Sequence, residues 1–221
     1  MEALVLFSGG QDSTTSLLWA KERFSRVHAL SFDYGQRHRI ELECAQALCK
    51  TLDVSQKIVD LTFLSDLHTN ALTSQVVEIS LQGGMNQLPS TFVPGRNALF
   101  LTVAAAYGVP KNIHHLVLGA CEVDYSGYPD CRQEFVQSQE KTLSLACDTQ
   151  LTIHTPLMNL TKAQTFEMAD QLGGLDLIVE QTHTCYHGER KQRMDWGYGC
   201  GTCPACTLRK NGYEEFVRNK T

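Results

Sequence analysis

The sequence lacks any excess of positive charge. Its 221 residues include 19 Lys and Arg against 24 Asp and Glu, a formal net charge of -5 with an isoelectric point near 5.9. Proteins whose main partner is nucleic acid bind phosphate backbones through clustered Lys and Arg. The charge balance therefore argues against direct nucleic-acid binding and favours small-molecule partners.

A long hydrophobic run is also missing. No stretch is long and apolar enough to span a bilayer, and the first residues enter an apolar segment without a basic leader or a small-residue cleavage site. We therefore expect a soluble, cytoplasmic protein with no membrane partner. A hydrophobic fraction of 43% in a chain of this length suits one α/β domain with an appendage.

Nine cysteines are present. In a cytoplasmic protein this odd count indicates metal ligands or free thiols rather than disulfides. Cys200, Cys203 and Cys206 follow one another at spacing three, and Cys185 precedes them. The other five are scattered and are interpreted as small buried hydrophobic side chains: Cys44, Cys49, Cys121, Cys131 and Cys147.

Four thiolates can form a closed tetrahedral zinc site, with Cys185 as the fourth ligand. A closed site leaves no position for water, so we predict one structural zinc ion per chain that fastens the C-terminal segment to the domain. An iron-sulfur cluster is the competing interpretation, although the further Cys of ferredoxin-like runs is missing. His183 and His187 flank Cys185 and stay open as alternative ligands.

Apolar runs and helical patterns alternate along the chain. This alternation predicts an open parallel five-stranded sheet with helices on both faces. Helical spacing places helices over Arg39–Leu52 and Arg96–Tyr107, and the capping-box pair Thr161 and Gln164 opens another that ends at Gly173. The expected strands are Ala3–Phe7, Val27–Phe32, Lys57–Leu61, Leu116–Ala120 and Leu151–His154.

Two parts are expected along the chain. Residues 1–180 would form a nucleotide-binding domain, and residues 181–221 a C-terminal zinc-binding segment packed on it. Residues 69–93 are polar and show no clear period, which predicts a long loop and a candidate lid. Ligands of open parallel sheets lie at the carboxyl ends of the strands, and the polar loops of this chain follow those ends.

The loop after the first expected strand has two glycines but no lysine. Gly9 and Gly10 let the backbone turn and approach a ligand, and the following helix start offers unpaired N–H groups to an anion. Without the lysine of a Walker loop, attack at the γ-phosphate is not indicated. The pattern predicts a loop that holds a departing pyrophosphate while a substrate is adenylated, with Asp12 suited to Mg²⁺; the alternative is a plain strand-to-helix turn. The candidate ATP-binding residues are Ser8, Gly9, Gly10, Gln11, Asp12, Ser13 and Thr14.

The loop SGGQDS resembles that of the N-type ATP pyrophosphatase superfamily. Further segments resemble, in order, the motifs of the 7-cyano-7-deazaguanine synthase family, over nearly the whole chain. They are FDYGQRH (32–38), TFVPGRN (91–97), SGYPDCR (126–132), TPL (155–157) with Lys162 after it, TCY (184–186) and CGTCPAC (200–206). The resemblance implies an adenine nucleotide alpha-hydrolase-like fold.

For function, the resemblance implies an ATP-dependent carbon-nitrogen ligase that converts 7-carboxy-7-deazaguanine and ammonia to 7-cyano-7-deazaguanine, a queuosine precursor. The acid and then the amide would be adenylated, with release of AMP and diphosphate. Zinc, ATP with Mg²⁺ and a homodimer are implied as well. The chain has no room for a glutaminase domain, so free ammonia is the expected nitrogen source. An enzyme that stops at the amide stays open.

Asp12, Arg96 and Lys162 are the expected catalytic residues. Arg96 and Lys162 stand at expected helix starts, where a cation opposes the helix dipole unless an anion is near. Among the substrate candidates, Glu122 and Asp124 would accept hydrogen bonds from a guanine-like edge. The full set of substrate candidates is Asp33, Arg37, His38, Glu122, Asp124, Tyr128 for stacking and Arg132 for a carboxylate.

Two rival classes remain. A tRNA sulfurtransferase or tRNA-lysidine-type ligase shares the phosphate loop but would want a basic tRNA-binding face. A zinc-containing nucleic-acid-binding module without catalysis would leave the polar strand-end loops unexplained.

The charge run Glu189–Arg193 is interpreted as a solvated face.

Overall fold

The computed structural model describes residues 1–67, 70–74, 76–80, 88–123 and 128–220. One parallel sheet of five strands has the order β3-β2-β1-β4-β5, and each neighbouring pair is parallel, which confirms the predicted sheet. The strands are β1 (Glu2–Leu6), β2 (Arg26–Asp33), β3 (Ser55–Asp60), β4 (His115–Val117) and β5 (Thr152–His154).

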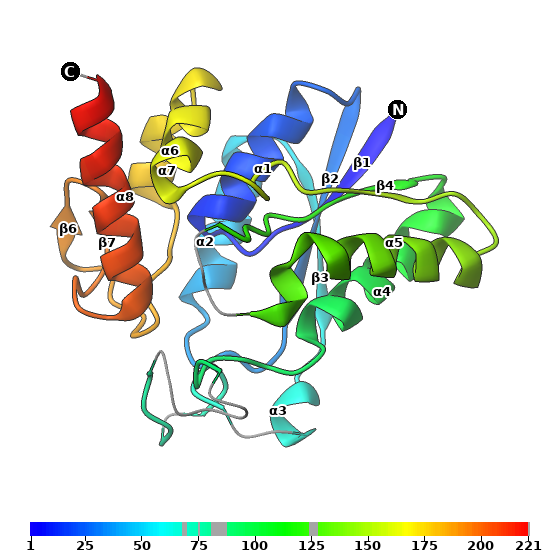
Figure 1. Ribbon diagram of the computed structural model, residues 1–221, viewed down its shortest axis with the longest axis horizontal. Helices are drawn as coiled ribbons and strands as arrows, with labels where there is room; N and C mark the ends of the chain where they lie inside the picture. The colour runs from blue at the N-terminus through cyan, green and yellow to red at the C-terminus, as the bar shows by residue number, and fades with distance from the viewer. Residues whose placement is uncertain (68–69, 75, 81–87, 124–127, 221) are drawn as a thin grey trace.

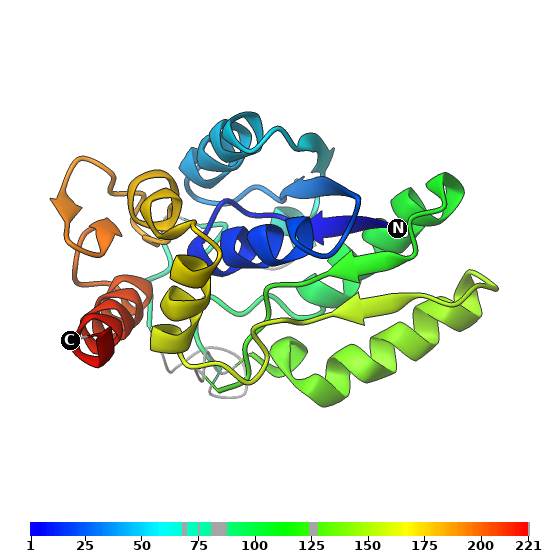
Figure 2. The same ribbon diagram turned by 90° about the horizontal axis from the view of Figure 1, so that it is seen from above.

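Helices cover both faces of the sheet (Figures 1 and 2). Successive residues of β1 alternate between two apolar clusters: Ala3 and Val5 pack under α1 and α2, whereas Leu4 and Leu6 pack under α4 and α5. The helices are α1 (Gln11–Lys21), α2 (Ile40–Thr51), α3 (Leu64–Leu67), α4 (Arg96–Gly108), α5 (Gln133–Ala146), α6 (Lys162–Gln171), α7 (Leu175–Gln181) and α8 (Pro204–Lys220).

The predicted start of α6 is confirmed in its capping geometry. The Thr161 hydroxyl accepts a hydrogen bond from the Gln164 backbone N–H at 3.3 Å, and the Gln164 side-chain oxygen accepts one from the Thr161 N–H at 2.9 Å. Gly173 ends the helix with a φ of +69°, in the left-handed region. Because the cap fixes the first turn, it also fixes Lys162, the first helical residue.

The C-terminal segment packs beside α6 and α7 (Figure 1), and β6 (Arg193–Met194) pairs with β7 (Gly197–Tyr198) in a short antiparallel hairpin. Phe166 of α6 and Phe216 of α8 share an apolar cluster with Ile178. The C-terminal helix is thereby joined to the preceding domain by a common core. Among the described residues, no helix has the length and apolar character needed to cross a membrane.

Several local expectations need correction. Cys44 and Cys49 are buried as predicted, but Cys121, Cys131 and Cys147 are only half-buried. The charge run is not simply solvated, because Arg190 donates to the carbonyl oxygens of Thr182 and Glu180, at 2.7 and 2.9 Å. The predicted loop 69–93 lies partly outside the described residues; its described parts hold turns and bends without a helix or strand.

Candidate active site

A cavity of about 340 Å³ opens at the carboxyl ends of β1, β2 and β4. β1 and β4 are neighbours in the sheet, yet the chain leaves β1 toward β2 and leaves β4 toward β5. Ligands of open α/β sheets bind at such a switch point. One side of the cavity is the phosphate loop; the other is aromatic and includes Phe32, Tyr34, Phe100, Tyr128 and Tyr186.

Close packing of the backbone explains why residue 9, the first glycine of the loop, is a glycine. Gly9 has a φ of +80°, and a Cβ added to it would lie 2.6 Å from the backbone nitrogen of Ala45. The Gly9 carbonyl accepts a hydrogen bond from the His183 N–H at 3.1 Å, so the C-terminal segment contacts the loop directly. Across the turn, the hydroxyls of Ser8 and Ser13 lie 3.1 Å apart. The loop is thus held in a conformation that only glycine allows without strain.

Most of the predicted ATP-binding residues line the cavity. Gln11 is only 3% exposed, and both polar atoms of its amide lack a hydrogen-bond partner among the described residues. Gly9 and Thr14 are not among the described lining residues: the Thr14 hydroxyl donates to the Gly10 carbonyl at 2.8 Å and so serves the helix start. The lining members of the set are Ser8, Gly10, Gln11, Asp12 and Ser13.

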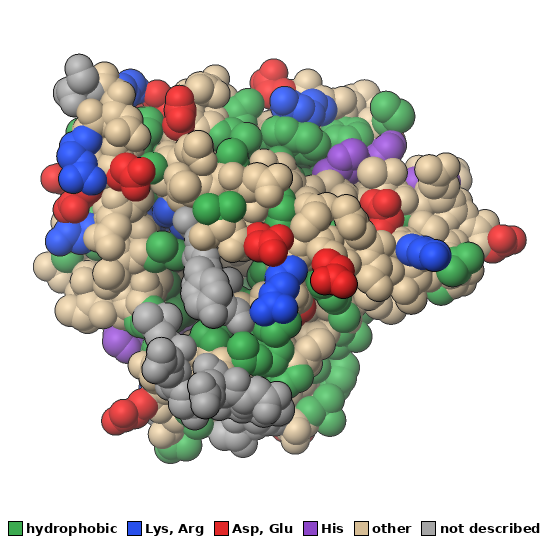
Figure 3. All heavy atoms as spheres, in the orientation of Figure 1, with side chains coloured by type: hydrophobic (Ala, Val, Ile, Leu, Met, Phe, Trp, Pro, Cys, Tyr) green, Lys and Arg blue, Asp and Glu red, His purple; other side chains and the backbone are tan. Residues whose placement is uncertain are grey.

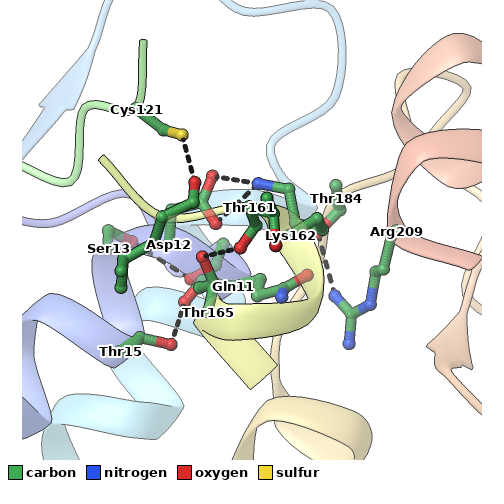
Figure 4. A network of polar contacts seen from close by, with 12 residues as sticks. Gln11, Asp12, Ser13, Thr15, Cys121, Thr161, Lys162, Thr165, Thr184 and Arg209 are labelled. Carbon is green, nitrogen blue, oxygen red and sulfur yellow. Dashed lines mark hydrogen bonds and ion pairs between the residues drawn. The ribbon is translucent and has the colours of Figure 1, made fainter. Parts of the chain in front are cut away.

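The cation that the loop sequence lacks is supplied by α6. The ammonium nitrogen of Lys162, 150 residues along the chain from Asp12, lies 2.9 Å from each of the two Asp12 carboxylate oxygens (Figure 4). Lys162 is 8% exposed, and its stem leaves no room for a side chain at Gly212 of α8. A phosphate bound at the loop could replace the Asp12 carboxylate as the partner of this buried ammonium group.

Arg209 of α8 also reaches the cavity, and the sequence did not single it out. It is 1% exposed and donates to the Thr184 hydroxyl at 2.9 Å (Figure 4). It also donates to the Thr182 hydroxyl at 2.8 Å and to the Ile178 carbonyl at 2.7 Å. Burial lowers the pKa of Arg209 to about 10, an effect that the nearby Asp12 charge opposes, so the group stays cationic at neutral pH. Its place one helical turn after Cys206 is the signal that could have revealed it.

The aromatic side of the cavity holds Arg96 and a second missed residue, Glu41. The guanidinium carbon of Arg96 lies 5.7 Å from the ring centre of Tyr34 and 5.9 Å from that of Tyr128. Burial raises the pKa of Glu41 to about 7, against the influence of the Arg96 charge. Glu41 was missed because its place in the helical pattern is that of an ordinary polar residue.

Of the described substrate candidates, only Tyr128 lines this cavity. The Asp33 carboxylate pairs with Arg39, His38 packs against Gly188, and the Arg37 N–H donates to the Leu72 carbonyl.

In the loop after β4, the Glu122 carboxylate accepts a hydrogen bond from the Gln133 N–H at 3.0 Å, at the start of α5. Arg132, the residue before Gln133, is exposed. Asp124 lies outside the described residues. Substrate roles for this loop therefore stay predictions.

Four cysteines converge beside the cavity. The sulfur atoms of Cys185, Cys200, Cys203 and Cys206 all lie within 4.8 Å of one another, and those of Cys200 and Cys206 are 3.9 Å apart. A tetrahedral zinc ion with Zn–S bonds of about 2.3 Å needs sulfur atoms separated by roughly 3.8 Å, so the set fits zinc.

Local hydrogen bonds favour a thiolate in this cluster. Burial raises the pKa of Cys200, but hydrogen bonds from the hydroxyl and backbone N–H of Thr202 bring it to about 7. His183 is not in the cluster of described ligand atoms; its Nε2 lies 3.0 Å from the Cys185 carbonyl oxygen.

The sheet order, the glycine loop and the Lys162 ammonium group beside it define a doubly wound α/β protein with a cavity at the switch point of its sheet. Two solved structures share the fold. A 4-thiouridine synthetase in complex with RNA and ATP has a TM-score of 0.52 at 16% identity, over 99% of this chain and 50% of that chain. The U34-tRNA thiolase NcsA from Methanococcus maripaludis, with its [4Fe-4S] cluster, has a TM-score of 0.53 at 12% identity, over 100% and 65%.

Sequence comparison is more specific than the fold. The family model described as "Queuosine biosynthesis protein QueC" matches residues 2–217. A 7-cyano-7-deazaguanine synthase of Bordetella pertussis is 55% identical over 97% of this chain and 92% of its own length. The synthase of Lysinibacillus sphaericus is 51% identical over 98% and 95%. The chain therefore belongs to the QueC family of 7-cyano-7-deazaguanine synthases.

Proposed function

We propose that this protein converts 7-carboxy-7-deazaguanine and ammonia to 7-cyano-7-deazaguanine and cleaves ATP to AMP and diphosphate in each of two activation steps. Family membership supports the substrate pair. The observation that carries the nucleotide chemistry is the Lys162 ammonium group held at the Asp12 carboxylate, on a loop without a lysine of its own. A cation placed there can screen the charge of a departing pyrophosphate.

The chemistry uses one site twice. A carboxylate oxygen of the acid attacks the α-phosphorus, and diphosphate leaves. Ammonia then adds to the acyl carbon, AMP leaves, and loss of a proton gives the amide. In the second round the amide oxygen attacks the α-phosphorus of a new ATP, and departure of AMP with loss of the nitrogen-bound protons gives the nitrile. The chain's own groups position the reactants and screen charge, without a covalent enzyme intermediate.

Metals have separate roles in this proposal. Asp12 would hold Mg²⁺ with the nucleotide phosphates, where the ion neutralises charge. Cys185, Cys200, Cys203 and Cys206 would hold one zinc ion in a closed structural site. Tyr186 and Thr184 flank Cys185 and line the cavity, so zinc binding would order one wall of the active site.

Small molecules are the proposed partners, without direct nucleic-acid binding. In support, Figure 3 shows charged side chains of both signs interspersed with hydrophobic and other side chains on the face that it displays, and the formal net charge is -5. A homodimer and a cytoplasmic location belong to the same proposal, on the family resemblance and the cysteine content.

Product analysis tests the function. The purified protein is incubated with 7-carboxy-7-deazaguanine, ammonium, Mg²⁺ and ATP, and bases and nucleotides are separated by liquid chromatography with mass spectrometry. We expect the nitrile and two equivalents of AMP. Amide with one equivalent of AMP would remove the second step, and ADP as the nucleotide product would refute the proposed cleavage of ATP.

A further inference from the structure

Glu41 is a carboxylate in the cavity wall that the proposed chemistry does not use. It is the second residue of α2 and lies among the residues that line the aromatic side. Its carboxylate has no hydrogen-bond or ion-pair partner among the described residues. Glu41 is half-buried, and an acidic group held partly out of water without a partner is costly, so a ligand with matching donors would remove that cost.

The backbone fixes Glu41 against the phosphate loop. Its carbonyl oxygen would lie 2.7 Å from a Cβ added to Gly9, so the first turn of α2 packs directly on the loop. The aromatic rings of Tyr34, Tyr128 and Tyr186 line the same cavity. Glu41 therefore lies with its backbone against the glycine loop, and its carboxylate charge acts on Tyr34 and Tyr186, two of the rings on which a flat heterocycle can stack.

Arg96 supplies a second group with an unpaired atom on this wall, although its side chain also hydrogen-bonds Tyr34. Its Nε is buried without a hydrogen-bond partner among the described residues, while its guanidinium lies near the rings of Tyr34 and Phe100. A ligand that presents N–H donors at one edge and a negative charge elsewhere would satisfy both Glu41 and Arg96. A heterocycle with a carboxylate substituent has this combination of groups.

The type of heterocyclic edge follows from the acceptor chemistry of a carboxylate. An ionised carboxylate has acceptors only, so it pairs with two adjacent N–H donors. A guanine-like ring presents its ring N–H beside its amino group, whereas an adenine edge presents one donor beside one acceptor. We propose that Glu41 accepts hydrogen bonds from the ring N–H and the amino group of the deazaguanine substrate and so selects that base.

This inference rests on the proposed function and gives Glu41 the acceptor role expected from the sequence for Glu122 and Asp124, whose roles stay untested predictions. The Glu122 carboxylate already accepts a hydrogen bond from the Gln133 N–H and lies outside the described lining of the cavity.

Steady-state kinetics of a Glu41→Gln variant test the assignment, with Glu43→Gln as the matched control on the exposed side of the same helix. The amide replaces one acceptor by a donor, so it clashes with a guanine-like edge but suits an adenine edge. We expect the KM for 7-carboxy-7-deazaguanine to rise by about 10- to 100-fold in Glu41→Gln, while the KM for ATP and the zinc content stay unchanged. The control should match the wild type.

A substrate analogue without the 2-amino group completes a double-mutant cycle. Removal of the amino group should cost the wild type about 10-fold in kcat/KM and cost Glu41→Gln much less, because the contact is already lost. An equal cost in both proteins would overturn the assignment. A change in the KM for ATP alone, in either direction, would place Glu41 at the adenine instead. The proposed function is judged separately, by whether the wild type forms the nitrile.

Discussion

At the scale of single residues, Lys162 gives the sharpest test of the phosphate site. Replacement by Met keeps much of the stem that packs against Gly212 and removes the charge beside Asp12. We expect kcat to fall by about 10²- to 10³-fold, the usual cost of one electrostatic contact to a transition state. Lys141→Met, on the exposed surface of α5, is the control and should leave kcat unchanged. A Lys162→Met enzyme with wild-type kcat would exclude the residue from catalysis.

Glu41 predicts a pH dependence of stability. Its pKa rises from 4.5 to about 7 on folding, so between these values the folded state keeps a proton that the unfolded state has lost. Its contribution to the free energy of unfolding is therefore full below pH 4.5 and is lost as the pH rises through about 7. Urea unfolding at pH 5 and pH 8 should show a smaller loss in Glu41→Gln than in the wild type. Equal losses would contradict a half-buried Glu41 carboxyl that titrates near pH 7.

Sequence reasoning at this scale had a signal where a residue opposed its local setting. Lys162 was singled out because a cation at a helix start is unfavourable unless a phosphate is near; the structure brings it to the Asp12 carboxylate, and its catalytic role stays a prediction. Glu41 carries no such signal, and Arg209 could be suspected only from its place one helical turn after Cys206. Their significance comes from burial in a cavity whose walls are far apart in the sequence, and only the fold brings those walls together.

At the scale of elements, the cap of α6 links stability to the site. Thr161→Ala removes the hydroxyl that accepts from the Gln164 N–H, and loss of an N-cap costs about 0.5–2 kcal/mol. We expect a lower melting temperature together with a reduced kcat, because Lys162 is the first residue of the helix. Thr142→Ala, within the exposed face of α5, should change both much less. A stable variant with normal kcat would show that the cap does not position Lys162.

Strands and capped helices were the elements that the sequence predicted well. Both faces of β1 are buried, so its continuous apolar run was a reliable signal. The end of β4 was less predictable. Apolar residues continue to Ala120, but the strand stops at Val117, and the chain then passes the phosphate loop where Gly119 lies against the backbone of Asp12. This close approach is a matter of tertiary packing, so the end of β4 could not be predicted from the hydrophobic pattern alone.

At the scale of the whole molecule, the four-cysteine cluster links the C-terminal segment to the wall of the cavity. Cys206 and Arg209 lie on α8, and Arg209 donates to Thr184, the residue before Cys185. Cys206→Ser should lose zinc, lower the melting temperature and weaken ATP binding, because the proposed zinc ion would hold α8 to the segment around Cys185.

Cys147→Ser, outside the cluster, is the matched control and should keep its zinc and its ATP affinity. Metal content is measured by mass spectrometry of the acid-digested protein and ATP affinity by calorimetry. Full zinc occupancy in Cys206→Ser would contradict the four-thiolate site, and unchanged ATP affinity in a zinc-free protein would separate the cluster from the cavity.

Attack by the substrate's own oxygen on the α-phosphorus is tested most directly with 7-carboxy-7-deazaguanine labelled with ¹⁸O in both carboxylate oxygens. Adenylation of the acid and then of the amide transfers one labelled oxygen to AMP in each round. Mass spectrometry should therefore find two equivalents of singly labelled AMP and an unlabelled diphosphate for each nitrile. Label in inorganic phosphate, together with ADP, would place the attack at the γ-phosphorus and contradict the function proposed for this loop.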